Sequence, residues 1–248
     1  MSHLPLGELG GHGVGAHALV ASDMPLSGHL VTFLFTCVTD IALIPPLMVM
    51  AKYRRHFEIY VGCLMVVSAF AYNFLDAMNR GDAEEKRWSL FIEEEDWHRI
   101  SNVSTTTSLC LLAIHLAHVE DAHLNILLRY AAATLVLFAQ IYDGFWMQET
   151  HVTVFVVVGF YGGLVASHIL VAQLPVYWTR ENLSYGAVLG TCAGGCFMLG
   201  LDDDSDQFRL AHGLSHLFGG VALTFLWNLI PRKRQKVGER DLRFKEYV

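Results

Sequence analysis

Residues 57–79 read FEIYVGCLMVVSAFAYNFLDAMN, an apolar run in which Glu58 and Asp76 are the only charged side chains. A helix needs about 20 mostly apolar residues to cross the hydrocarbon core of a bilayer, so this run is long enough to cross. Periodicity does not separate helix from strand in so apolar a run, but its length favours a helix. We therefore expect a transmembrane helix here.

Six further segments of the chain have the same character. With 53% hydrophobic and only 17% charged residues, the chain is more apolar than soluble domains, which carry about 25% charge. The formal net charge of -7 also argues against nucleic acid as a partner. The sequence predicts an all-α membrane protein, a seven-transmembrane-helix bundle with spans at 29–50, 57–79, 96–118, 124–143, 151–173, 183–201 and 208–230. Pro45 and Pro46 should kink or end the first of these helices.

The distribution of charge predicts the orientation of the bundle. Lys52, Arg54 and Arg55 follow the first span, Arg180 follows the fifth, and seven basic residues follow the last span between positions 232 and 245. The alternate loops are acidic. Because cytoplasmic loops carry the excess of lysine and arginine, we expect the N-terminus outside and the C-terminus in the cytoplasm.

These features divide the chain into three parts. Residues 1–28 form a flexible Gly/His-rich tail, 29–231 the seven-helix transmembrane domain, and 232–248 a basic cytoplasmic tail. The first tail has neither the basic n-region of a secretory signal nor the arginines of a mitochondrial presequence. We expect an integral protein of the plasma membrane or an internal membrane, with membrane lipids as partners of the basic tail.

Placing an ionisable side chain inside a membrane span costs free energy, so each such residue suggests a functional role. His212 and His216 stand four residues apart near the outer end of the last span, so they share a helix face. Asn73 and Asp76 share a face in the outer part of the second span. Two histidines alone do not make a zinc site, which needs three protein ligands, so this pair is either part of a metal site or a packed pair of histidines.

Other polar residues in the spans are harder to interpret. His115 and His118 lie at the inner end of their span, too deep to join the His212–His216 pair, and we expect them at the cytoplasmic interface. Asp40 lies mid-span with no evident partner, and is either protonated or bonded to the Ser/Thr-rich face of residues 104–108. Residues near the outer ends of other spans are Asp96, His98, Arg99, Tyr142, Asp143 and His151.

Three short motifs resemble those of the myomaker and transmembrane-protein-8 family. They are Ile41-Ala-Leu-Ile-Pro45 with Lys52-Tyr-Arg-Arg55 and Glu58, the second span ending in Asp76, and His212-Gly-Leu-Ser-His216 followed by Pro231-Arg-Lys-Arg234. That family belongs to the CREST superfamily, whose enzymes are seven-helix hydrolases with zinc held by three histidines.

The resemblance implies a role for each matching position. His212 and His216 match the two late zinc ligands, and Asp76 matches the aspartate that orients or deprotonates the zinc-bound water. Asn73 stands where the family has its first histidine, and an amide oxygen is a poorer zinc ligand than imidazole. Either another side chain such as His151 completes a zinc site, or the site is degenerate.

Two functions therefore compete. A zinc-dependent hydrolase would use metal-bound water to attack a lipid amide or ester. A non-catalytic protein would serve as a membrane-remodelling or fusion factor, or as a structural subunit of a membrane assembly, and the missing ligand histidine favours this function. Small residues would then let helices pack within the chain, with other membrane proteins or in a homo-oligomer: Gly159, Gly162, Gly163, Gly190, Gly194 and Gly195. A receptor or transporter lacks support, because we find no internal repeat.

Overall fold

The structure, a computed structural model, describes residues 26–80, 87–119, 121–141, 159, 162–166, 178–201, 206 and 208–230. Its main elements are all helical: α1 (Leu26–Thr36), the 3-10 helix η2 (Thr39–Leu43), α2 (Ile44–Lys52), α3 (His56–Asn79), α4 (Glu94–Leu116), α5 (Ala122–Ile141), α7 (Arg180–Leu199) and α8 (Leu210–Asn228). The one strand-like pairing in the described part of the chain is an isolated bridge between Leu90 and Ile92.

Three helical stretches are long and apolar enough to cross a membrane: Leu26–Lys52, His56–Asn79 and Leu210–Asn228. They indicate an integral membrane protein, and the helix predicted at 57–79 is confirmed. Helix α4 is long as well, but its first turn is acidic and a Ser/Thr run follows at residues 104–108. The predicted span at 151–173 lies outside the described residues, except for 159 and 162–166, which are helical.

The predicted tails lie almost wholly outside the described residues. One boundary is wrong, because α1 begins at Leu26 and residues 26–28 are helical instead of belonging to a flexible tail. The apolar character of Leu26 and Leu30 extends the helix outward by one turn beyond the predicted start.

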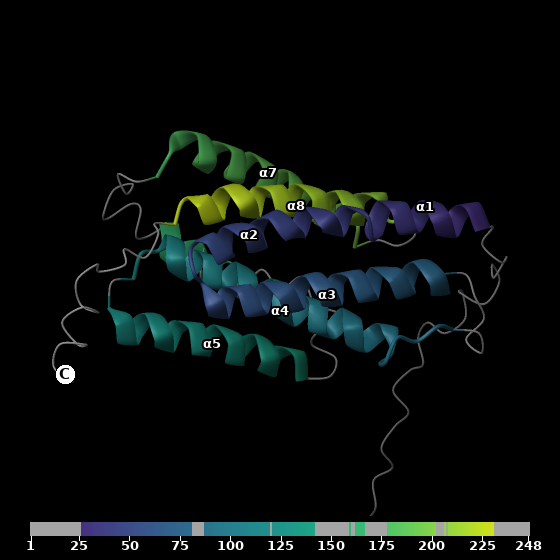
Figure 1. Cartoon of the computed structure of the whole chain (residues 1–248), viewed down its shortest axis with the longest axis horizontal. Coiled ribbons are helices and arrows are strands. Elements are labelled where there is room, and N and C mark those ends of the chain that lie inside the picture. The colour runs from purple at the N-terminus through teal and green to yellow at the C-terminus, as the bar shows by residue number, and fades with distance from the viewer. Residues whose placement is uncertain are drawn as a thin grey trace, which may run out of the picture.

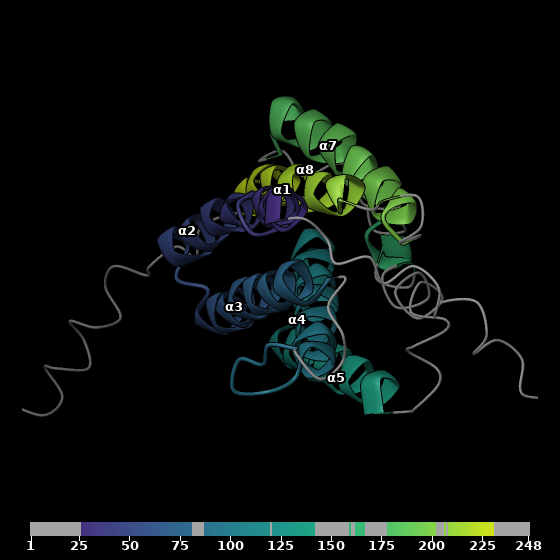
Figure 2. The same cartoon turned by 90° about the vertical axis from the view of Figure 1, so that its right-hand side faces the viewer.

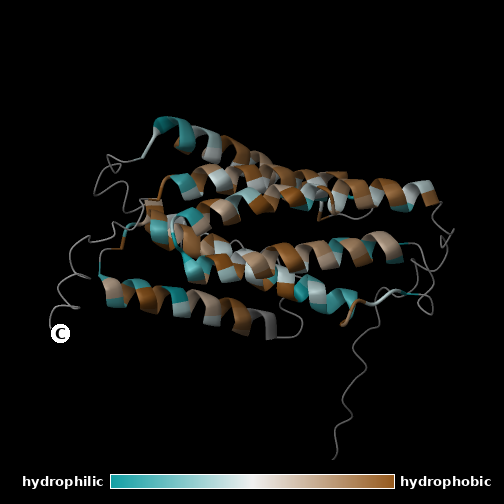
Figure 3. Cartoon of the chain, viewed as in Figure 1, coloured by the Kyte–Doolittle hydropathy of each residue, from teal (hydrophilic) through white to brown (hydrophobic). Residues whose placement is uncertain are grey.

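The helices lie roughly along one direction (Figure 1). Helices α1, η2 and α2 follow one another as a rod that packs along α8, and α7 covers another side of α8. Helix α3 packs on α4, and α4 on α5, as the view along the bundle shows (Figure 2). Apolar colour covers much of α1 and the middle of α3, whereas the beginnings of α4 and α7 are hydrophilic (Figure 3).

Side-chain contacts identify the two ends of the bundle. At one end, which we call the Tyr53 end, the Tyr53 hydroxyl donates to Asn228 Oδ1 at 3.2 Å, joining the ends of α2 and α8. At the other, the Asn79 end, the Asn79 amide donates to Glu94 Oε2 at 2.8 Å, joining the end of α3 to the start of α4. Neighbouring helices in sequence therefore run in opposite directions from α1–α2 to α5. Buried Met50, Leu112 and Trp227 form a core cluster toward the Tyr53 end.

The predicted disruption of the first helix by proline is present, but it lies before the prolines. The α-helix stops at Thr36, continues as η2, and restarts as α2 with proline in its first turn. Proline suits a first turn, where its missing N–H has no helical acceptor. In a helix the Ala42 carbonyl would accept from the N–H three or four residues later. Those residues are Pro45 and Pro46, which have no N–H, so this carbonyl is left without a helical donor.

Glycines on α8 let the rod approach at this break. A Cβ added at Gly220 would meet the Ala42 carbonyl, and one at Gly213, seven residues earlier on the same face, would meet the Phe35 carbonyl. The Cα–H groups of these glycines therefore face main-chain oxygens of the rod. Of the glycines we expected to pack within the chain or with a partner, Gly190 lies opposite Ala222 of α8, at 3.9 Å from an added Cβ. At the other five no described residue lies within 4 Å of an added Cβ: Gly159, Gly162, Gly163, Gly194 and Gly195.

The first testable prediction concerns this backbone contact. Gly220→Ala should destabilise the protein by about 1–3 kcal/mol, because a main-chain carbonyl must move to admit the new methyl group. Gly194→Ala is the matched control; its neighbourhood is open, and a helical Gly→Ala change gains up to about 1 kcal/mol. Thermal unfolding of the detergent-solubilised protein measures both. Equal melting temperatures for the two variants would contradict the contact.

Candidate functional site

Four side chains from three elements form a polar network inside the bundle. Asn73 of α3 is at its centre: its amide nitrogen donates to Asp40 Oδ2 of η2 at 2.9 Å, and its oxygen lies 3.1 Å from His212 Nε2 of α8. His216 Nδ1 bonds the other carboxylate oxygen of Asp40. We call Asp40, Asn73, His212 and His216 the polar network. Asp40 and Asn73 are buried, so their partners come from within the protein.

The hydrogen bonds constrain the tautomers of the two histidines. Because the Asn73 oxygen is a carbonyl and can only accept, His212 Nε2 must carry its proton and donate. With Asp40 as a carboxylate, which can only accept, His216 donates from Nδ1. In the neutral imidazoles the remaining lone pairs are then on His212 Nδ1 and His216 Nε2. The rings lie side by side, with centroids 4.7 Å apart.

The close contact of Gly213 with the rod positions this network. Gly213 follows His212 directly and allows α8 to touch the rod at Phe35, five residues before Asp40. The start of α8 is held by Asp206, whose carboxylate accepts from the backbone N–H groups of Ala211 and His212 at 3.1 and 3.0 Å. A carboxylate at a helix N-terminus satisfies amides that have no helical acceptor.

Asp76, which we expected beside the histidines, pairs with arginines instead. Its carboxylate accepts from Arg209 Nε at 3.2 Å and from Arg80 Nη2 at 3.2 Å. Arg209 also donates to the Tyr72 hydroxyl and to the Gly200 carbonyl, both at 3.4 Å. Its backbone has a φ of 56° just before α8 begins. Arg209 therefore ties the entrance of α8 to α3 and to the end of α7.

We call Asp76, Arg80 and Arg209 the arginine layer. Aromatic contacts connect it with the polar network. The Tyr72 ring stacks on His98 of α4 with centroids 4.4 Å apart and meets His212 edge-on at 6.3 Å. Asp96 and Arg99, in contrast, form an exposed pair at 4.0 Å. Of the polar residues expected near the outer ends of other spans, His98 thus reaches the site, and Tyr142, Asp143 and His151 lie outside the described residues.

The described residues do not by themselves supply three ligands for zinc, and His151, the other ligand considered, lies outside them. Within the described ranges, no group of three or more His, Cys, Asp or Glu side chains is arranged to hold a metal ion. His212 and His216 each use one ring nitrogen in the polar network, which leaves one nitrogen each. Zinc sites use at least three protein ligands, and the amide of Asn73 is already bonded on both of its atoms.

The comparison with protein families adds an affiliation. The sequence model described as "Protein of unknown function (DUF3522)" matches residues 28–217. The chain belongs to this family. The range that matches the DUF3522 family includes the complete polar network together with Asp76 and Arg209. No curated protein matches the chain.

A second polar cluster of this DUF3522 protein lies at the Tyr53 end. Glu58 at the start of α3 is buried and bonds His115 Nε2 at 2.6 Å and Arg129 Nη1 at 2.7 Å. His115 lies at this end of the bundle, away from the His212–His216 pair, as predicted. It is buried there because the buried Glu58 carboxylate needs a partner. In the connection between α2 and α3, partial burial lowers the pKa of Arg55, an effect that Glu58 opposes.

Sequence reasoning missed two residues of the site. We expect Asp40 to be protonated or bonded to the Ser/Thr-rich face of residues 104–108, whereas its partners are Asn73 and His216. The signal for such a partner is its cost, because an unpaired Asp at a helix centre costs about 3 kcal/mol. Arg209 follows an acidic run at residues 202–206 and falls at the start of the span predicted at 208–230. Nothing in the sequence indicates that it turns back to Asp76.

The second prediction tests the polar network. Asp40→Ala should destabilise the protein by about 1–3 kcal/mol, because it leaves the Asn73 amide and His216 Nδ1 buried without their acceptor. Asp96→Ala removes a carboxylate from an exposed pair and should change stability by less than about 1 kcal/mol. Thermal unfolding in detergent compares the two. A loss in Asp40→Ala no larger than in Asp96→Ala would contradict the network.

Proposed function

We propose that the chain is a non-catalytic, seven-span membrane protein that acts in membrane remodelling or fusion, or as a structural subunit of a membrane assembly. The observation that carries this proposal is the position of Asn73, whose amide donates to Asp40 and accepts from His212. Where the resembling CREST enzymes have a ligand histidine, this chain has a side chain that completes an internal hydrogen-bond network.

Such a network suits a structural role. In a medium without water, a hydrogen-bonded carboxylate, amide and pair of imidazoles tie three helices together, whereas unpaired groups would be costly. The arginine layer of Asp76, Arg80 and Arg209 has the same character, because each carboxylate oxygen is matched by a guanidinium N–H. A hydrolase needs instead an open position for water and substrate on its metal.

The directions of the helices support seven crossings. Helix α5 begins at the Tyr53 end, since Arg129 reaches Glu58. Helix α7 begins there too, because Gly186 in its first half lies against Leu226 and Gly200 at its end lies against His212. Two helices that both cross in the same direction require a return crossing between them, and the apolar run at 151–173 is long enough to supply it.

Charge supports the orientation. Lys52, Arg54 and Arg55 lie at the Tyr53 end, and Glu94 to Asp96 begin α4 at the Asn79 end. By the positive-inside rule, the Tyr53 end faces the cytoplasm. The polar network and the arginine layer then belong to the outer half of the bundle, as the sequence led us to expect.

The alternative is a zinc-dependent lipid hydrolase of the CREST type. One observation favours it: the rings of His212 and His216 are neighbours, 4.7 Å apart, and each keeps one nitrogen lone pair. The two functions differ in metal content, which is directly measurable.

The third prediction is therefore that purified wild-type protein contains far less than one zinc per chain. Asn73→His should raise the zinc content, because it restores a third imidazole beside His212 and His216. Elemental analysis after extensive dialysis measures both, with the His212→Ala/His216→Ala double variant as the background. Stoichiometric zinc in the wild type that is lost in the double variant would overturn the non-catalytic proposal in favour of the hydrolase.

The fourth prediction addresses orientation. A glycosylation sequon engineered into residues 81–86, next to the Asn79 end, should be glycosylated in a eukaryotic membrane, because that loop faces away from the cytoplasm. The same sequon placed in residues 235–240 should stay unmodified. A gel shift removed by glycosidase reports the modification. Modification of the tail alone would mean that the orientation is inverted.

A further inference from the structure

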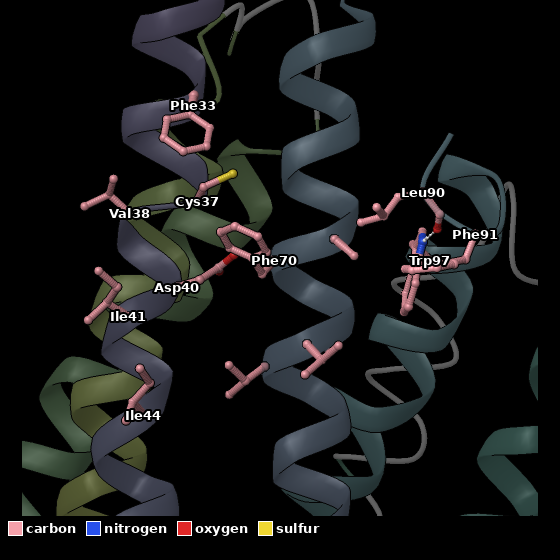
Figure 4. A pocket seen from close by; sticks show the side chains of 13 residues that line it. Phe33, Cys37, Val38, Asp40, Ile41, Ile44, Phe70, Leu90, Phe91 and Trp97 are labelled. Atoms are coloured by element: carbon pink, nitrogen blue, oxygen red, sulfur yellow. Dashed lines mark hydrogen bonds between the residues drawn. The ribbon is translucent and has the colours of Figure 1, made fainter. Parts of the chain in front are cut away.

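A groove of about 490 Å³ crosses α3 on the outside of the bundle. The rod of α1, η2 and α2 forms one side, and Leu90, Phe91 and Trp97 form the other (Figure 4). We call it the side groove. Its volume falls within the range of small-molecule sites, roughly 300–1,000 Å³.

The side groove is apolar. Among the described residues that line it, Asp40 alone is charged. Both of its carboxylate oxygens are engaged, one by His216 and one by Asn73. The Asp40 carboxylate is therefore not free to bind a polar ligand in the groove. Its surface suits a hydrocarbon chain, which needs contact but no hydrogen bonds.

The groove opens toward the medium around the bundle. Ile41 of the rod and Val67 of α3 line it while remaining 60% and 56% exposed. Both belong to helical stretches long and apolar enough to cross a membrane, and the medium around such helices is lipid. The hydrocarbon available to fill the groove is thus a lipid tail.

Three apolar side chains, Leu90, Phe91 and Trp97, form the far wall of the groove. Trp97 Nε1 donates to the Leu90 carbonyl at 2.8 Å, which leaves its ring as an apolar surface. Phe91 is 97% exposed and has a φ of 64°, a left-handed conformation that is strained for a bulky residue. Tryptophan prefers the boundary between lipid tails and headgroups, so a chain would enter past Trp97 and extend toward Ile44.

We propose that the side groove binds one acyl chain of a bilayer phospholipid and that this chain covers Asp40 on the face away from His216. The proposal needs only that the rod and α3 lie in the membrane. It is independent of the zinc question, so either proposal can fail without the other.

Quenching of Trp97 fluorescence tests the proposal directly. The full chain is reconstituted in phosphatidylcholine vesicles with an increasing fraction of brominated acyl chains, and the Trp97 signal is the difference between wild type and Trp97→Phe. A bound chain predicts that this signal is quenched in proportion to the brominated fraction, because the groove holds a brominated chain with that probability. Val67→Phe fills the groove and should lose most of this quenching. Val188→Phe, at an exposed position on α7 (61% exposed), should keep it.

Native mass spectrometry of the detergent-solubilised protein gives a second readout. We expect one phospholipid retained by wild type and Val188→Phe, and none by Val67→Phe, with circular dichroism confirming that all variants are folded. A Trp97 signal that bromine does not quench would mean that the groove is filled by the protein itself, and would overturn the proposal. So would quenching that is unchanged in Val67→Phe, since that describes contact of Trp97 with bulk lipid outside the groove.

Discussion

A carboxylate inside an apolar rod must find its partners within the protein, and the arrangement of the bundle around Asp40 follows from that constraint. Lipid tails offer neither hydrogen bonds nor charge, so Asp40 is tolerable only beside donors. Asn73 and His216 supply them from α3 and α8. For both helices to reach one carboxylate, α8 must approach the rod closely, and Gly213 and Gly220 permit that approach.

Two further buried carboxylates of the described residues obey the same constraint, one at each end. Asp76 is matched by arginines at the Asn79 end, and Glu58 by His115 and Arg129 at the Tyr53 end. Each cluster joins elements that are distant in sequence, so it specifies which helices are neighbours and in which register. Such specificity is the best-supported role of buried polar groups, whose net contribution to stability is small.

The polar network and the side groove meet at Asp40. One face of the residue is bonded to the network, and the other lines a surface that suits hydrocarbon. An acyl chain there would keep competing hydrogen-bond partners away from the carboxylate and so strengthen its bonds to Asn73 and His216. The groove, the network and the glycine contact thus form one continuous region between the rod, α3 and α8.

The sequence by itself determined the helical class, the membrane character and the helix at 57–79, because run length and composition are local properties. It also singled out Asn73, His212 and His216, since helical spacing places residues on a face. Only the tertiary structure decided that Asp40 joins them and that Asp76 turns to Arg209 instead. Those pairings depend on how deeply each helix sits and how closely α8 approaches the rod. The closeness of α8 to the rod is set by contacts of Gly213 and Gly220 with carbonyls far away in sequence, which no local pattern records.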